Sequence, residues 1–367
     1  MFLFSKRKYF LLEEKYILKK NDIVFARTGN STGRAYLYDT EDGPLAFAGF
    51  LIKYQLDESK VNPKFIRYFT ISDYYKQWVN NLSVGSTRGN ISAQTFADCP
   101  IILPSRKQQD CTVSFLSALD RKIALNRSIN RNLEALAKQL YDYWFVQFDF
   151  PNEDGRPYKS SGGKMVWNED LKREIPEGWE VTKLKDLAET EKDQINPQSF
   201  PDIHFKHYSL PEFDKTGTYG VELGSEIQSN KFVISENSVM VSKLNTWTNR
   251  VICGNDEDNQ IGSTEFVVLN PKNVQYKPFI FQLVKSEKFI TYCTKGSTGT
   301  SHSHRRISPD LLVSFRFAYK KNVVEQYSKT LSKYISLLQE NTKNTQMLTK
   351  QRNELLPLLM NGQVSVG

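Results

Sequence analysis

Two pairs of polar stretches carry the residue types in this sequence that could do chemistry. They are residues 27–34 and 86–92 in the first half, and residues 242–250 and 297–306 in the second half. Each pair mixes arginine or lysine with asparagine, serine and threonine. Arginine can pair with guanine and asparagine with adenine, while hydroxyls and lysines contact phosphates. The stretches therefore predict binding to duplex DNA, although polar loops that contain glycine can also be simple surface loops.

The candidate DNA-contacting residues fall into two sets, one for each half of the chain. The first set is Arg27, Asn30, Ser31, Arg34, Thr87, Arg88 and Asn90. The second set is Lys243, Asn245, Thr246, Asn249, Arg250, Thr298, Ser301, His302, His304, Arg305 and Arg306. Corresponding stretches differ in sequence while their flanking hydrophobic runs agree in pattern. This difference is expected if one scaffold carries two DNA specificities.

The sequence lacks the motifs of enzymes that act on DNA. Asn196–Ser199 comes nearest to the motif of an adenine methyltransferase, but it lacks the second proline and the stacking aromatic residue. Neither a Gly-x-Gly-x-x-Gly turn nor a Gly-x-x-x-x-Gly-Lys-Ser/Thr loop is present. Glu58–Lys60 has a nuclease-like spacing without a matching upstream aspartate, and the histidine pairs in 204–207 and 302–304 lack a third metal ligand. We therefore expect a non-catalytic protein with no cofactor and no bound metal.

Charge and hydropathy agree with a folded protein that has a polyanionic partner. The 367 residues include 49 Lys and Arg against 41 Asp and Glu, a net charge of +8, and the chain has a pI near 9.0. This balance suits nucleic acid without identifying it. No apolar run approaches the roughly 20 residues that cross a bilayer, so we expect a cytoplasmic protein with no membrane partner. The four scattered cysteines are expected to be free thiols.

The two halves of the chain align with one another. Asp22–Arg27 aligns with Ser238–Lys243 at an offset of 216 residues, and Ile91-Ser92 aligns with Ile307-Ser308 at the same offset. Ile91-Ser92 leads into the apolar run 101–103, and Ile307-Ser308 leads into the apolar run 315–318. Both runs are predicted to form strands. A period of this length indicates a duplicated domain rather than a solenoid repeat.

A long heptad pattern follows each copy, and the two patterns match at a constant offset of 215 residues. The heptad seam is Leu116, Leu119, Ile123, Asn126, Asn130, Leu133, Ala137, Leu140 and Trp144 in the first helix, and Leu331, Tyr334, Leu338, Asn341, Thr345, Leu348, Arg352, Leu355 and Leu359 in the second. Both helices have polar residues at the same two central places, Asn126 with Asn341 and Asn130 with Thr345. Two amphipathic helices could each pack on their own domain, but the matched polar positions favour helices that pack against each other. A 29-residue seam would span roughly 40 Å and act as a spacer.

These patterns predict an α/β chain of two modules, each followed by a long helix. The predicted boundaries are residues 1–107 for the first module, 108–146 for its helix, 147–174 for a linker, 175–322 for the second module and 323–362 for its helix. Turn-forming residues between 149 and 164 mark the linker.

This order resembles the DNA-specificity subunit family of Type I restriction-modification systems. Ile175–Val181 with Leu184 and Leu187 is similar to the opening of a target-recognition domain, Gly85–Arg88 to its late loop, and Leu116–Ile123 to the start of the helix that follows it. The resemblance implies two globular α/β target-recognition domains joined by an antiparallel coiled coil, each reading half of a bipartite target. It also implies partner subunits: adenine methyltransferase subunits that use S-adenosylmethionine, and ATP-dependent restriction subunits.

One departure from the family pattern concerns the first module. The second module opens near Ile175, and its counterpart in the first copy would precede Met1. We therefore expect a first target-recognition domain shortened at its amino-terminal side, and a second module that keeps its specificity better. The alternative function is a non-enzymatic coiled-coil interaction scaffold whose modules bind protein or sugar. Trp247 slightly favours this alternative, while the loop arginines oppose it.

Overall fold

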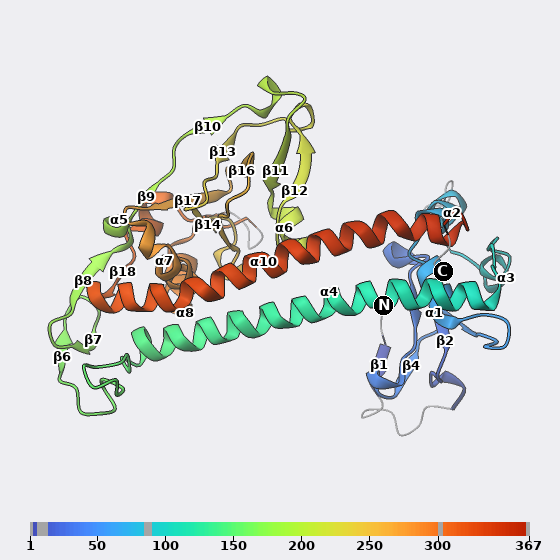
Figure 1. Ribbon diagram of the computed structural model, residues 1–367, viewed down its shortest axis with the longest axis horizontal. Coiled ribbons are helices and arrows are strands. Elements are labelled where there is room, and N and C mark those ends of the chain that lie inside the picture. Colours follow the sequence, from blue (N-terminus) through green and yellow to red (C-terminus); the bar gives the residue numbers. More distant parts are fainter. Residues whose placement is uncertain (1–2, 6–13, 84–89, 300–303, 365–367) are drawn as a thin grey trace. The chain divides into compact units, whose positions relative to one another are not determined.

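The computed structural model describes residues 3–5, 14–83, 90–299 and 304–364 (Figure 1). The chain divides into two compact units: unit 1 comprises residues 1–126 with 344–367, and unit 2 comprises residues 127–343. Both units contain strands and helices, as the predicted α/β class requires. In the described residues, no helix is both long and apolar enough to cross a membrane.

Unit 1 is built around a three-stranded antiparallel sheet with the order β3-β2-β5. Its elements are β1 (Leu3–Ser5), β2 (Asp22–Ala26), β3 (Ala35–Leu37), β4 (Leu45–Phe47), β5 (Leu51–Gln55), α1 (Pro63–Phe69), α2 (Asp73–Ser83) and α3 (Ala93–Ala97), with β1 paired to β4. All five residues of the central strand β2 are buried. Phe25 and Phe65 lie in one core with Leu116, Leu356 and Leu359 from the long helices.

Unit 2 contains two larger sheets and two strand pairs. The sheets have the orders β15-β14-β17-β9 and β10-β13-β16-β11-β12, and the pairs are β8 with β18 and β6 with β7. The strands are β6 (Met165–Asn168), β7 (Arg173–Pro176), β8 (Glu180–Lys183), β9 (Ala188–Thr190), β10 (Gln194–Ile195), β11 (His204–Tyr208), β12 (Gly220–Leu223), β13 (Lys231–Val233), β14 (Val239–Ser242), β15 (Val251–Cys253), β16 (Gln260–Gly262), β17 (Phe266–Pro271) and β18 (Arg316–Tyr319). The shorter helices are α5 (Leu184–Leu187), α6 (Leu210–Thr216), α7 (Lys277–Val284), α8 (Glu287–Gly296) and α9 (Pro309–Val313).

The predicted long helices are present as α4 (Arg106–Tyr141) and α10 (Lys321–Met360). In unit 2 they run antiparallel, because Asn130 contacts Thr342 while Ala137, further along α4, contacts Tyr327, which is earlier on α10. In unit 1, Arg352 donates to Asp120 over 2.9 Å. Every residue of both seams is buried or half-buried. The predicted long helix after each module is thus confirmed.

The predicted strand at residues 101–103 is wrong. These residues form neither helix nor strand, and Ile102 is 68% exposed. The equivalent segment of the second copy does form a strand, β18, which pairs with β8 from Glu180 to Lys183. A strand is stabilised by hydrogen bonds to a neighbour, and within the described residues of unit 1 nothing takes the place of β8.

Candidate nucleic-acid interface

The first polar stretch of each copy closes the same kind of hairpin. Strand β2 pairs with β3, and β14 with β15, in identical register: Ile23 faces Leu37, and Val239 faces Cys253. The loops between these strands have equal length and hold residues 27–34 and 243–250. The duplication predicted from sequence is therefore present as duplicated strand register at the 216-residue offset.

The two loops also share their backbone conformation. Gly29 and Asn245 have φ angles of 77° and 52°, and four residues later Gly33 and Asn249 have φ angles of 82° and 50°. Glycine and asparagine are the residues that adopt this left-handed region most readily. The hydroxyl of Thr32 donates to the carbonyl of Gly29 over 2.6 Å, and that of Thr248 donates to the carbonyl of Asn245 over 2.8 Å.

The second polar stretch of each copy meets the first through the same hydrogen bond. Ile91 N donates to the carbonyl of Arg27 over 2.9 Å, and Ile307 N donates to the carbonyl of Lys243 over 3.0 Å. The next residues, Ser92 and Ser308, cap the short helices α3 and α9. Two loops that are far apart in sequence thus form one surface in each unit, and the side chains on that surface differ between the units.

In unit 1 this surface presents cationic and amide side chains. Arg27 Nε donates to Asn90 Oδ1 over 3.1 Å. Asn30 and Arg34 are exposed, and Ser31 is half-buried. The candidates Thr87 and Arg88 lie outside the described residues.

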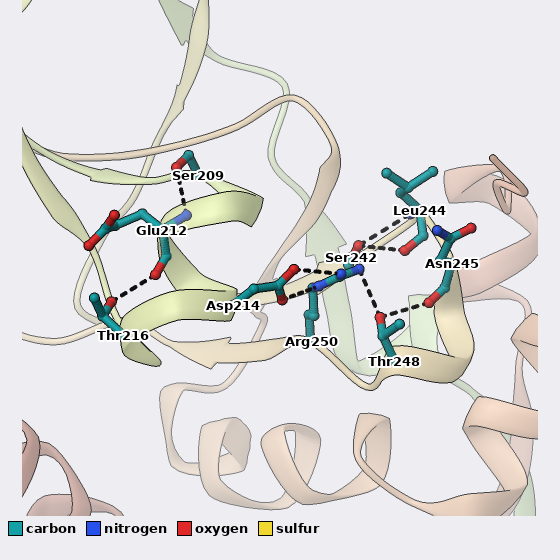
Figure 2. A network of polar contacts seen from close by, with 9 residues as sticks. All are labelled: Ser209, Glu212, Asp214, Thr216, Ser242, Leu244, Asn245, Thr248 and Arg250. Carbon is teal, nitrogen blue, oxygen red and sulfur yellow. Dashed lines mark hydrogen bonds and ion pairs between the residues drawn. The ribbon is translucent and has the colours of Figure 1, made fainter. Parts of the chain in front are cut away.

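In unit 2 two of the predicted arginines are held by carboxylates. Arg250 donates to both oxygens of Asp214, from Nε over 2.6 Å and from Nη2 over 2.7 Å, and its Nη1 donates to Thr248 Oγ1 over 2.8 Å (Figure 2). Arg306 is paired with Glu265 through two bonds of 3.0 and 3.2 Å. The hydrogen bonds from Arg250 lower the pKa of Asp214, and those to Glu265 raise the pKa of Arg306. Asp214 lies on α6 and Glu265 directly before β17, so neither partner could be found from loop composition.

Three further candidates of unit 2 make hydrogen bonds inside the unit. Thr246 is buried, and its hydroxyl lies 3.1 Å from that of Thr294 and 3.3 Å from that of Ser297. Arg305 Nη2 donates to the carbonyl of Ser297 over 2.5 Å. Asn245 Oδ1 accepts from Arg305 N over 3.2 Å.

The other side chains of this surface lie nearer the solvent. Lys243 is half-buried, while Asn249, Thr298 and His304 are exposed. Ser301 and His302 lie outside the described residues. Trp247, which was not among the candidates, is 43% exposed at the loop tip.

The remaining histidine pair, His204 with His207, shows no metal-site geometry. His207 is buried, its Nδ1 lies 3.2 Å from Glu222 Oε1, and burial lowers its pKa despite this carboxylate. Among the residues the structure describes, no three His, Cys, Asp or Glu side chains group as metal ligands do.

The fold and these paired loops define a class of duplicated two-module proteins, and comparison with known proteins gives the family that it resembles. Residues 4–135 match the family profile of the Type I restriction modification DNA specificity domain. The chain is 26% identical to the Type I restriction enzyme MjaIX specificity subunit of Methanocaldococcus jannaschii over 81% of this chain and 67% of that protein. It is 24% identical to the HindI specificity subunit of Haemophilus influenzae over 96% of this chain and 88% of that protein.

A solved structure supports the same fold. The Type I restriction-modification S subunit from M. genitalium matches with a TM-score of 0.56 at 18% identity, over 93% of this chain and 83% of that chain. The predicted resemblance is thus confirmed: this chain is a relative of Type I specificity subunits. Such subunits are non-catalytic components of their enzymes, which agrees with the prediction that the chain is not itself an enzyme.

Proposed function

We propose that this protein is the sequence-specific DNA-binding subunit of a Type I restriction-modification complex. In this proposal each module reads one half of a bipartite target, and the chain docks adenine methyltransferase subunits and ATP-dependent restriction subunits. Catalysis belongs to those partners, and this chain supplies recognition. The protein works on duplex DNA inside the cell.

The observation that carries the proposal is the pair of matched loops. Their backbones agree in strand register, left-handed positions and the threonine hydrogen bond, while their side chains differ. A backbone that is the same in both copies but carries different side chains is what two specificities on one scaffold require. The loops then determine specificity while the scaffold holds them in place. Arg27, Asn30, Arg34 and Asn90 would supply polar contacts in one module, and Lys243, Asn249 and Thr298 in the other.

The proposal can be tested by selecting duplexes from a randomised library with the full chain, alone and with its methyltransferase subunits, at several salt concentrations. We expect enrichment of a split motif with a fixed gap, and an affinity that falls as salt rises because bound counterions are released. Retention of no duplex at low salt, with the partners present, would refute the DNA-binding function. A single half-motif would refute the bipartite reading and leave one module as the reader.

A further inference from the structure

The loop tip of unit 2 carries a large aromatic side chain where the loop tip of unit 1 carries a small polar one. Trp247 is the counterpart of Ser31 at the 216-residue offset. Its indole is 43% exposed. An exposed indole at a loop tip offers a partner a large apolar surface.

Both neighbours of Trp247 are anchored, so the backbone that carries the indole is held in place. On one side, Thr246 is buried against Thr294 and Ser297, and the short turn at 246–248 packs on α8. On the other side, Thr248 donates to the carbonyl of Asn245 and accepts from Arg250 (Figure 2). Because this backbone is already ordered, binding a partner costs conformational entropy only in the side chain.

The arginines around this tip are already committed to partners inside the unit. Arg250 is held by Asp214 on α6, Arg306 by Glu265, and Arg305 by the carbonyl of Ser297. An arginine that already donates two hydrogen bonds to one carboxylate has few donors left to pair with guanine. Arg250 is thus suited to fix the loop, and Trp247 is the apolar group at the tip, beside the exposed polar side chains of Thr248 and Asn249.

Resting on the proposed function, the geometry points to Trp247 as a residue that contacts base edges in the half-site read by the second module. Arg250, locked by Asp214, is a positioning residue for it. Apolar side chains read base pairs by packing on the thymine methyl group or by pressing against a base step. The second module therefore reads part of its half-site by an apolar contact, whereas the first module, with Ser31 at the same place, does not.

The test compares full-length Trp247→Ala with Trp167→Ala, using the duplex selected by the wild-type chain and a random duplex. Trp167 is a matched control because it lies in the same unit, is 59% exposed and is placed on β6, away from the loop. We expect Trp247→Ala to bind the selected duplex roughly tenfold to hundredfold more weakly. Random-duplex binding and its salt dependence should stay unchanged, because no charge is removed. Trp167→Ala should behave as the wild type does.

A second measurement does not depend on the alanine variant folding well. In full-length Trp167→Phe, the selected duplex should change the tryptophan emission more than a random duplex does, and this difference should disappear when Trp247→Phe is added, because Trp78, Trp144 and Trp179 remain in both proteins. Wild-type affinity of Trp247→Ala for the selected duplex, or unchanged emission, would overturn the inference while leaving the proposed function intact. If the wild-type chain selects no duplex at all, the proposed function fails first.

Discussion

At the residue scale, the Arg250–Asp214 pair shows how a residue type that suits DNA can be used inside the protein instead. The pair is bidentate, but the Asp214 side chain is 48% exposed, so solvent reduces its contribution to stability. Its larger effect is on charge, because it removes one free cation from the loop surface of unit 2.

Replacing Asp214 by alanine should release that cation. We expect the variant to bind random duplex more tightly, with a salt dependence steeper by about one phosphate contact, a slope change of about 0.9. Discrimination in favour of the selected duplex should fall, because Arg250 no longer fixes the loop. The double variant Asp214→Ala with Arg250→Ala is the control and should lose the added affinity. A salt slope equal to that of the wild type in Asp214→Ala would contradict this account.

His207 provides a prediction about stability and pH. Burial holds its pKa below the ordinary value of about 6.5, although Glu222 opposes this shift, and the buried Lys231 nearby adds to it. Because the unfolded chain binds this proton more readily, the stabilisation is complete above about pH 6.5 and is lost as the pH falls, by at most about 1.4 kcal/mol per pH unit. His207→Gln should therefore lose less stability than the wild type between pH 7 and pH 5 in urea unfolding. The exposed His204→Gln should follow the wild-type curve, and parallel curves for all three proteins would rule the effect out.

At the element scale, the polar contact between Asn130 and Thr342 in the helix pair has a cost that can be measured. Asn130 Nδ2 donates to Thr342 Oγ1 over 3.1 Å, while its Oδ1 is buried with no partner among the described residues. Thr342 keeps its own bond to the carbonyl of Leu338 over 2.7 Å. A buried polar atom without a partner costs about 1–3 kcal/mol, but a polar seam position can fix the register of two helices.

We therefore expect Asn130→Leu to raise the free energy of unfolding by about 1 kcal/mol. The measurement is urea unfolding of the full-length chain. The matched control is Arg131→Leu, which changes an exposed position of the same helix and should have little effect. A clear loss of stability in Asn130→Leu would mean that the asparagine bond outweighs the unpaired oxygen.

The sequence predicted periodic elements well, because helix and strand periodicities are local properties of the chain. The seam residues from Leu116 to Trp144 are all buried or half-buried, as the heptad pattern requires. The failure at Ile101–Leu103 has a different cause: an apolar run becomes a strand only when a neighbour accepts its hydrogen bonds, and β8 provides that neighbour only for β18. The ion pairs of Arg250 and Arg306 were missed for a related reason, since their carboxylates lie 36 and 41 residues away along the chain.

At the scale of the whole molecule, the duplication makes the two loops comparable position by position. The loops at 27–34 and 243–250 have the same length and the same left-handed positions, and a threonine occupies the same place in both. Converting the first loop into the second at positions 28–31 therefore needs only Thr28→Leu, Gly29→Asn, Asn30→Thr and Ser31→Trp. Gly33 must be kept, because a Cβ atom there would lie 2.5 Å from a methyl group of Val79.

This four-residue exchange should be tolerated, since a Cβ atom at Gly29 meets nothing within 4 Å and asparagine accepts its positive φ. We expect the exchanged chain to unfold cooperatively, with a free energy within about 1–2 kcal/mol of the wild type. In duplex selection, the first half-site should change while the second half-site and the gap stay as they are. Changing Gly33→Asn in addition should destabilise unit 1 through Val79. If both half-sites change together in the exchanged chain, the modules do not read DNA independently, and the one-module, one-half-site assignment is wrong.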